Sequence, residues 1–302
     1  MKENISERKQ KLSNQMSSYY HNNGSYHINI PELTGERPST EEKALFEKIK
    51  TYHNFPQNTK ILELGCGSCE CAPALVSMLD VKEYYGVDAS PFAIQSARQK
   101  HPSYNLNVGD ATHLPFTDNF FDVVISNFVL EHMVEPEKFL KEAVRVTRKG
   151  GLISLILPVY DLPWLIPPSL RYQRKNINFL VRYSVIRWIE MLKLRYQAKY
   201  FKFRIVEKPI VLLETENYNF QPDDDLVYIA SSLEISKYLM HSGCKVLSLN
   251  GRDITPCIAN GNRPVIDILR WITFNLLRFS LMKKEISDYT TTASIIVRKD
   301  ID

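Results

Sequence analysis

The segment Ile61–Glu70 constrains this chain more than any other, because it changes from one backbone pattern to another within a few residues. An apolar run ends at Gly65 and Gly67, and apolar residues at helical spacing follow. Such a run before Gly-x-Gly predicts a buried strand that turns sharply into a helix. Glycine adopts positive φ without strain and lets a ligand approach the backbone closely. Free N–H groups at the helix N-terminus then favour a nucleotide-type ligand.

The residues around the glycines indicate which kind of nucleotide would bind. A dinucleotide-binding turn has the form G-x-G-x-x-G, whose third glycine permits tight packing beside a pyrophosphate. Glu70 stands at that third position, and Glu63 adds a carboxylate two residues before the first glycine. Two carboxylates disfavour a pyrophosphate and favour a positively charged ligand, such as one with an amino group and a sulfonium.

Strand-like and helical segments alternate along the first half of the chain. The capping box at Ser39–Glu42 predicts an opening helix through about Tyr52. Alternation of strands and helices is typical of a parallel sheet covered by helices on both faces. The expected strands are residues 60–64, 83–88, 104–108, 123–126 and 152–157, and a helix at 233–241 and a strand at 243–249 continue the series.

The pattern Glu63-x-Gly65-x-Gly67 resembles the first motif of class I S-adenosylmethionine-dependent methyltransferases, and the resemblance continues in order to about Pro158. The chain is most similar to the branch that modifies small molecules in biosynthesis. This resemblance implies an α/β, Rossmann-like, doubly wound seven-stranded sheet with helices on both faces, an antiparallel last strand at 293–297 and a helical cap insertion. It also implies S-adenosylmethionine as cofactor, bound by Glu63, Gly65, Gly67, Asp88, Ala89, Asp110, Ala111, Asn127 and Phe128.

Two of these acids have specific expected roles. Asp88 ends a strand about 20 residues after the glycine turn, where a carboxylate accepts hydrogen bonds from ribose hydroxyls. The resemblance places Asp110 beside the adenine, where it would accept from the exocyclic amine. Each also has a plainer interpretation, Asp88 as a helix N-cap and Asp110 as an ordinary turn residue.

Methyl transfer to an oxygen of high pKa needs a base, and three residues are candidates. His132 follows the fourth expected strand, and Tyr160 and Asp161 follow the fifth. A single histidine near a helix start is also common as a structural residue.

A basic segment after the fifth strand is expected to determine the substrate. Between residues 165 and 210, eleven Lys or Arg oppose two Glu, a local charge of +9, and Arg171 and Arg174 are candidate substrate contacts. Basic charge beside an active site favours an anionic or sugar-like acceptor, and it also suits RNA or a membrane surface. The acids between Glu214 and Asp225 allow a further interpretation, in which opposite charges of the cap pair with one another.

The composition is that of a globular protein. The 302 residues are 44% hydrophobic and 24% charged, with a net charge of +4. No apolar stretch is long enough to predict a membrane-spanning helix, although an apolar helix at 264–282 could rest on a membrane. Three of the five cysteines crowd the glycine turn without a second pair of metal ligands. We therefore expect no metal, no disulfide and a cytoplasmic location.

The expected organisation is an N-terminal arm (1–38), a cofactor-binding core (39–158), a substrate cap (159–225) and the rest of the core with an inserted helix (226–302). The expected function is methyl transfer from S-adenosylmethionine to a small molecule, with an oxygen acceptor preferred. Two alternatives remain open: an RNA methyltransferase that uses the basic cap, and a protein that binds the cofactor without turnover. The chain shows no recognisable RNA-binding module, and Glu70 argues against a nicotinamide dehydrogenase.

Overall fold

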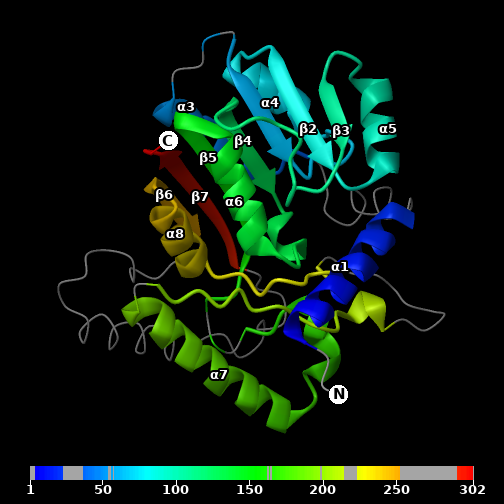
Figure 1. Cartoon of the computed structure of the whole chain (residues 1–302), viewed down its shortest axis with the longest axis vertical. Helices are drawn as coiled ribbons and strands as arrows, with labels where there is room; N and C mark the ends of the chain where they lie inside the picture. The colour runs from blue at the N-terminus through cyan, green and yellow to red at the C-terminus, as the bar shows by residue number, and fades with distance from the viewer. Residues whose placement is uncertain are drawn as a thin grey trace.

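A computed structural model of the chain describes residues 4–22, 37–53, 56, 58–161, 163, 165–197, 199–213, 223–251 and 291–301. A twisted sheet of seven strands forms its centre, in the order β3-β2-β1-β4-β5-β7-β6 (Figure 1). The strands are β1 Lys60–Leu64, β2 Glu83–Asp88, β3 Asn105–Val108, β4 Phe121–Asn127, β5 Thr147–Val159, β6 Cys244–Gly251 and β7 Thr291–Lys299.

The first five strands are parallel, and β7 lies antiparallel between β5 and β6. The predictions of a doubly wound sheet and of an antiparallel last strand are therefore confirmed. The observed β5 begins earlier than expected, because its first residues continue directly from the preceding helix.

Helices cover both faces of the sheet, as expected. On one face α6 (Pro136–Val146) and α8 (Ser232–His241) pack against alternate strand residues such as Leu62 and Leu64. On the other face the intervening residues, such as Ile61, contact helices α3 (Thr40–Tyr52), α4 (Ala72–Leu79) and α5 (Pro91–Lys100). Successive side chains of a strand point to opposite faces, so strands buried on both faces are apolar almost throughout.

The predicted capping box at the start of α3 is present. The Ser39 hydroxyl accepts a hydrogen bond from the Glu42 N–H, and the Glu42 carboxylate accepts one from the Ser39 N–H. Both bonds satisfy backbone donors that a helix start otherwise leaves without partners.

Strand order places a crevice at the carboxyl edge of the sheet. From β1 the chain continues outward through β2 to β3, and then returns to β4 on the opposite side of β1. Helices after β1 and β4 therefore diverge at this point, and ligands of doubly wound sheets bind where such a reversal occurs.

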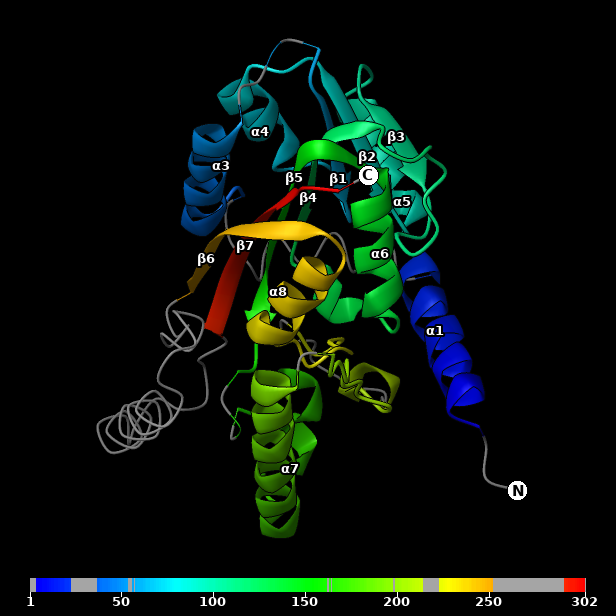
Figure 2. The same ribbon diagram turned by 60° about the vertical axis from the view of Figure 1, so that its left-hand side comes forward.

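The N-terminal segment is more regular than the arm expected from the sequence. Residues Ile5–Asn22 form an 18-residue helix, α1, which lies beside the carboxyl edge of the sheet (Figures 1 and 2). Leu12 and Met16 are buried against Val134, Val211 and Val227. Tertiary packing on this small apolar set stabilises a helix whose own sequence has only a weak amphipathic pattern.

The cap between β5 and α8 contains a long helix, α7 (Ile177–Tyr196), with the short helices η2 (Pro168–Gln173) and η3 (Ile210–Leu212). No helix within the described part of the chain is long and apolar enough to cross a membrane. The apolar helix expected at 264–282 and the acids Glu214 and Glu216 lie outside the described residues.

Candidate functional site

The glycine turn after β1 is built so that one side stays open. Gly65 has φ of +71°, and a Cβ there would lie 2.2 Å from the Val129 side chain, so no other residue fits. Gly67 has φ of +52°, but a Cβ there would meet no atom within 4 Å. Gly65 is thus required by packing, whereas Gly67 leaves space beside the backbone for a ligand.

Asp88, at the end of β2, holds this turn in place. One carboxylate oxygen accepts a hydrogen bond from the Gly67 N–H at 2.8 Å, and the other accepts from the Ser90 N–H at 2.8 Å. The capping of α5 is done by the Ser90 hydroxyl, which accepts from the Ala93 N–H. Asp88 therefore does not serve as the N-cap, and its remaining lone pairs lie beside the cavity.

Glu63 is buried within β1 and accepts a hydrogen bond from the Tyr84 hydroxyl at 2.5 Å. Burial raises its pKa to about 7, against the lowering effect of that hydrogen bond. A carboxyl group poised at this pKa ionises readily when a cation approaches. Nearby, Arg37 forms a two-bond ion pair with the buried Glu42, so the cavity's arginine is already neutralised.

A cavity of about 650 Å³ runs along the carboxyl edge of the sheet. It is lined by every cofactor-binding candidate and by the candidate base, namely Glu63, Gly65, Gly67, Asp88, Ala89, Asp110, Ala111, Asn127, Phe128 and His132. Among the residues that the structure describes, eight carboxylate side chains line it against one arginine and one histidine. This surplus of negative charge suits a cationic ligand.

The cavity lining includes a buried amide. Within the described part of the chain, neither the nitrogen nor the oxygen of the Asn127 side chain has a hydrogen-bond partner, although the residue is only 5% exposed. Its neighbour Phe128 has φ of +57°, which is rare for an aromatic residue and occurs mostly where function demands it. A buried amide that lines a cavity fits a polar ligand that would satisfy it.

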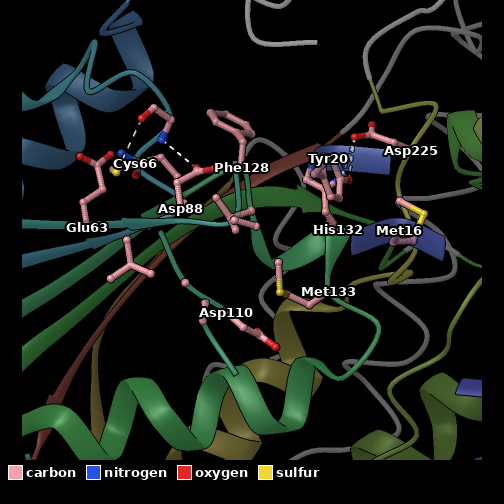
Figure 3. A pocket seen from close by; sticks show the side chains of 18 of the residues that line it. Met16, Tyr20, Glu63, Cys66, Asp88, Asp110, Phe128, His132, Met133 and Asp225 are labelled. Carbon is pink, nitrogen blue, oxygen red and sulfur yellow. Dashed lines mark hydrogen bonds and ion pairs between the residues drawn. The ribbon is translucent and has the colours of Figure 1, made fainter. Parts of the chain in front are cut away.

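The residues therefore fit S-adenosylmethionine. Gly67 leaves room at the backbone, Asp88 and Asp110 offer carboxylates, and Asn127 offers an unsatisfied amide. Figure 3 shows Glu63 and Asp88 on one side of Phe128, with His132, Tyr20 and Asp225 on the other. The cavity thus has one end beside the glycine turn and a second end beside His132.

The second end is centred on His132, whose side chain is 12% exposed. Its Nδ1 lies 3.4 Å from an Asp225 carboxylate oxygen, and the Tyr20 hydroxyl donates to that carboxylate at 2.9 Å. Burial alone lowers the pKa of His132, but the charges of Asp225 and Glu131 outweigh it, and the net shift is upward. The contact is an ion-pair distance and not a hydrogen bond, so a carboxylate lies beside one nitrogen of the imidazole without the hydrogen bond that orients the histidine of a catalytic triad.

Two further acids complete this cluster. Glu131 is fully buried, neither carboxylate oxygen has a hydrogen-bond partner among the described residues, and burial raises its pKa to about 8. Burial also raises the pKa of Asp223, to about 6. Among the described residues, Glu131, His132 and Asp223 bring ligand atoms within 4.8 Å of one another, a spacing that could hold a divalent cation.

Backbone hydrogen bonds bring the distant acids to His132. The N–H groups of Val227 and Tyr228 both donate to the Glu131 carbonyl, at 2.9 and 2.7 Å. Asp225 and Tyr20 were not among the sequence candidates, because they lie far from His132 along the chain. The run of three aspartates at 223–225 was the only sequence signal for this cluster. Pairing with the basic residues of the cap was one interpretation of that run.

Of the candidate bases and substrate contacts that follow β5, three lie elsewhere. Asp161 accepts hydrogen bonds from Ser231 and Ser232 at the start of α8, and the buried Tyr160 hydroxyl has no partner within the described part of the chain. Arg174 donates to the Ile166 carbonyl at 3.4 Å. These three residues do not belong to the cavity lining, and the side chain of Arg171 lies outside the description. Contact of any of the four with substrate stays a prediction.

The chain resembles known methyltransferases. Residues 62–155 match the family described as "Methyltransferase domain". A 2-methyl-6-phytyl-1,4-hydroquinone methyltransferase of Oryza sativa is 31% identical over 121 residues, 39% of this chain and 36% of the relative. Ajmaline N-methyltransferase of Rauvolfia serpentina is 26% identical over 155 residues, 48% of this chain and 53% of the relative. The chain thus spans about a third to a half of these relatives.

A methyltransferase-fold structure from Bacillus halodurans superposes with a TM-score of 0.51 at 18% identity, over 86% of this chain and all of the other. At that identity the likeness concerns the fold alone. The matched domain, the sheet order and the open glycine turn agree on a methyltransferase domain of the class I fold at residues 62–155, with S-adenosylmethionine as the methyl donor.

Proposed function

We propose that this protein transfers the methyl group of S-adenosylmethionine to a hydroxyl oxygen of a small molecule, with His132 as the base. The observation that carries the proposal is the Asp225–His132 pair at the second end of the cavity. When bound, the cofactor supplies an electrophilic methyl group, so the protein mainly has to align the acceptor and exclude water.

His132 would take the proton that the acceptor hydroxyl loses as the new carbon–oxygen bond forms. Nδ1 faces Asp225, and Nε2, which lies 3.9 Å from the Glu131 carboxyl group, would accept that proton. The Asp225 carboxylate then stabilises the imidazolium, and the Tyr20 hydroxyl orients the carboxylate. General-base catalysis of this kind contributes about 10²–10⁴-fold in rate.

The charge of this end of the cavity favours an uncharged acceptor. Asp223 and Asp225 line the cavity beside His132, and an anionic group placed next to their carboxylates would be repelled. Two of the basic residues that suggested an anionic acceptor, Arg187 and Arg204, pair with Glu190 instead. The relatives' names include a hydroquinone and an alkaloid, both small organic molecules, in keeping with such an acceptor.

The function can be tested with methyl-labelled S-adenosylmethionine and two substrate pools, a low-molecular-weight cell extract and total RNA. We expect label in small organic molecules of the extract and none in RNA. Label in RNA alone would overturn the proposal in favour of an RNA methyltransferase. Calorimetric binding of the cofactor without label in either pool would indicate a binding protein without turnover.

The role of His132 can be tested once a labelled product is available. We expect His132→Gln to lower kcat by about 10²-fold or more while the cofactor Kd stays unchanged. Because the His132 pKa is raised, kcat of the wild type should increase with pH through a value above 6.5.

Asp225→Asn provides the matched test of positioning. It removes the charge that raises the His132 pKa, so the rise of kcat should move to lower pH as the maximum falls. Retention of activity in EDTA is also expected. A loss in EDTA that Mn²⁺ restores, together with an unchanged pH profile in Asp225→Asn, would assign the cluster to a metal instead.

A further inference from the structure

Helix α7 carries a continuous stripe of exposed apolar side chains. Its members and exposed fractions are Ile177 73%, Val181 59%, Val185 52%, Ile189 48%, Leu192 41% and Tyr196 52%. At about 100° per residue these six positions fall within an arc of about 120°. The described part of the chain has twelve large apolar residues this exposed, and half of them lie on this one helix face. Single exposed apolar residues are normal, but a concentration of this kind marks an interaction surface.

On α7 the acid is buried and the exposed charged residues are all basic, unlike on an ordinary surface helix. Its one acid, Glu190, lies on the buried face, where it pairs with Arg187 and Arg204. Asn178 is exposed within this arc, and Arg182 and Lys193 are exposed along one edge of it, so this face carries positive charge and no acid. A helix that exposes apolar and basic residues together has two attractions for the same partner, one hydrophobic and one electrostatic.

The position of α7 leaves this face accessible. Figures 1 and 2 show the helix standing apart from the sheet, at the lower end of the molecule in both views. Its inner face contributes Tyr183, which packs with Tyr160, the residue next after β5. The helix is therefore anchored at the carboxyl edge of the sheet, the same edge that holds the cavity.

We propose that the α7 stripe docks this protein on the surface of an anionic lipid membrane. The helix would lie in the plane of the interface, with the stripe among the acyl chains and with Arg182 and Lys193 at the phosphate groups. Since α7 is not apolar enough to span a bilayer, the contact is peripheral. A second copy of the chain fits less well, because pairing two such faces would bring their basic residues together with no acid to neutralise them.

The test measures cosedimentation of the full chain with phosphatidylcholine vesicles that contain or lack phosphatidylglycerol. We expect binding to the anionic vesicles, weakened by added salt. Val181→Asp combined with Ile189→Asp should reduce the partition coefficient by about tenfold or more, because charges cannot enter the acyl region. Arg182→Gln with Lys193→Gln should weaken binding to anionic vesicles and remove most of its salt dependence.

A matched control is Phe92→Asp, an exposed apolar-to-acid change on α5, at 51% exposure, which should leave vesicle binding unchanged. Thermal melting and cofactor binding verify that each variant is folded. Equal vesicle binding by the wild type and the α7 aspartate variant, or no binding to any vesicle, would overturn the proposal. A dimer in sedimentation velocity that the α7 aspartates dissociate, without vesicle binding, would assign the stripe to a second copy. Neither result depends on whether methyl transfer occurs.

Discussion

At the scale of a single residue, the buried Glu131 makes the stability of the folded protein depend on pH. Among the described residues, Glu131 has no hydrogen-bond partner for either carboxylate oxygen and is fully buried, so desolvation raises its pKa to about 8. Its folded-state pKa lies above the unfolded value of about 4.3, so the folded state holds the proton more tightly. This proton makes its full contribution to the free energy of unfolding below about pH 4, and the contribution is lost progressively as pH rises to about 8.

We expect Glu131→Gln to show this loss directly. Glutamine keeps the shape of the protonated acid and does not ionise, so the variant should be more stable than wild type at pH 9 by a few kcal/mol, of the order that linkage allows. The difference in Tm between variant and wild type should grow steadily from pH 5 to pH 9. The exposed Glu47→Gln serves as control. Parallel pH curves for Glu131→Gln and wild type would show that Glu131 is ionised and paired in the folded protein.

At the scale of elements, we expect α1 to be the part of the site that separates from it most easily. The helix lines the cavity with Ser13, Met16, Ser17 and Tyr20, but packs through a small apolar cluster that includes Leu12. Helices held by few buried contacts open at low free-energy cost relative to the sheet. The contact between Tyr20 and Asp225 should therefore form and break together with the docking of α1.

Leu12→Ala tests this coupling without touching the cavity lining. Deleting a buried leucine side chain costs about 2–5 kcal/mol where the structure cannot relax. We expect α1 to undock while the rest of the protein stays folded. Amide exchange in residues 5–22 should then become faster, with little change in global Tm. Turnover should fall because Tyr20 no longer orients Asp225. The exposed Gln15→Ala should have none of these effects. A full drop in Tm with unchanged exchange in α1 would show that the helix and core unfold as one unit.

At the scale of the whole molecule, the cofactor cavity joins parts of the chain that are far apart in sequence. Its walls come from α1, from the turns after β1, β2 and β4, and from the Asp223–Asp225 loop. A ligand that bridges these parts stabilises the folded state by mass action, about 2.7 kcal/mol at a hundredfold excess over Kd.

We therefore expect S-adenosylmethionine to raise Tm by several degrees, and NAD not to. Gly67→Val should abolish the shift, because its side chain would enter the space beside the turn. The Tm of Gly67→Val without ligand serves as the control, because it reports the strain of placing valine at a positive φ. A larger shift with NAD than with S-adenosylmethionine would contradict the assignment of the cofactor.

The predicted and observed structures agree wherever residues close in sequence determine the structure. Apolar runs, the Gly65–Gly67 turn and the Ser39–Glu42 capping box are local, so the strands, the helices and the crevice could be predicted. The order of the strands, with β7 antiparallel, followed from the resemblance. α1 was missed because its helical pattern is weak and its stability comes from Leu12 and Met16 packing on distant residues.

The sequence by itself determined that this chain forms a doubly wound sheet with a glycine turn for a cationic nucleoside, because strand and helix periods and glycine φ angles are local properties. Only the tertiary structure decided what surrounds His132. Asp225 reaches it because backbone hydrogen bonds fasten the loop 223–228 to the Glu131 carbonyl, and Tyr20 reaches it through the docking of α1. Likewise, only the packing decided that Arg187 and Glu190 of α7 face the protein while its apolar stripe faces solvent.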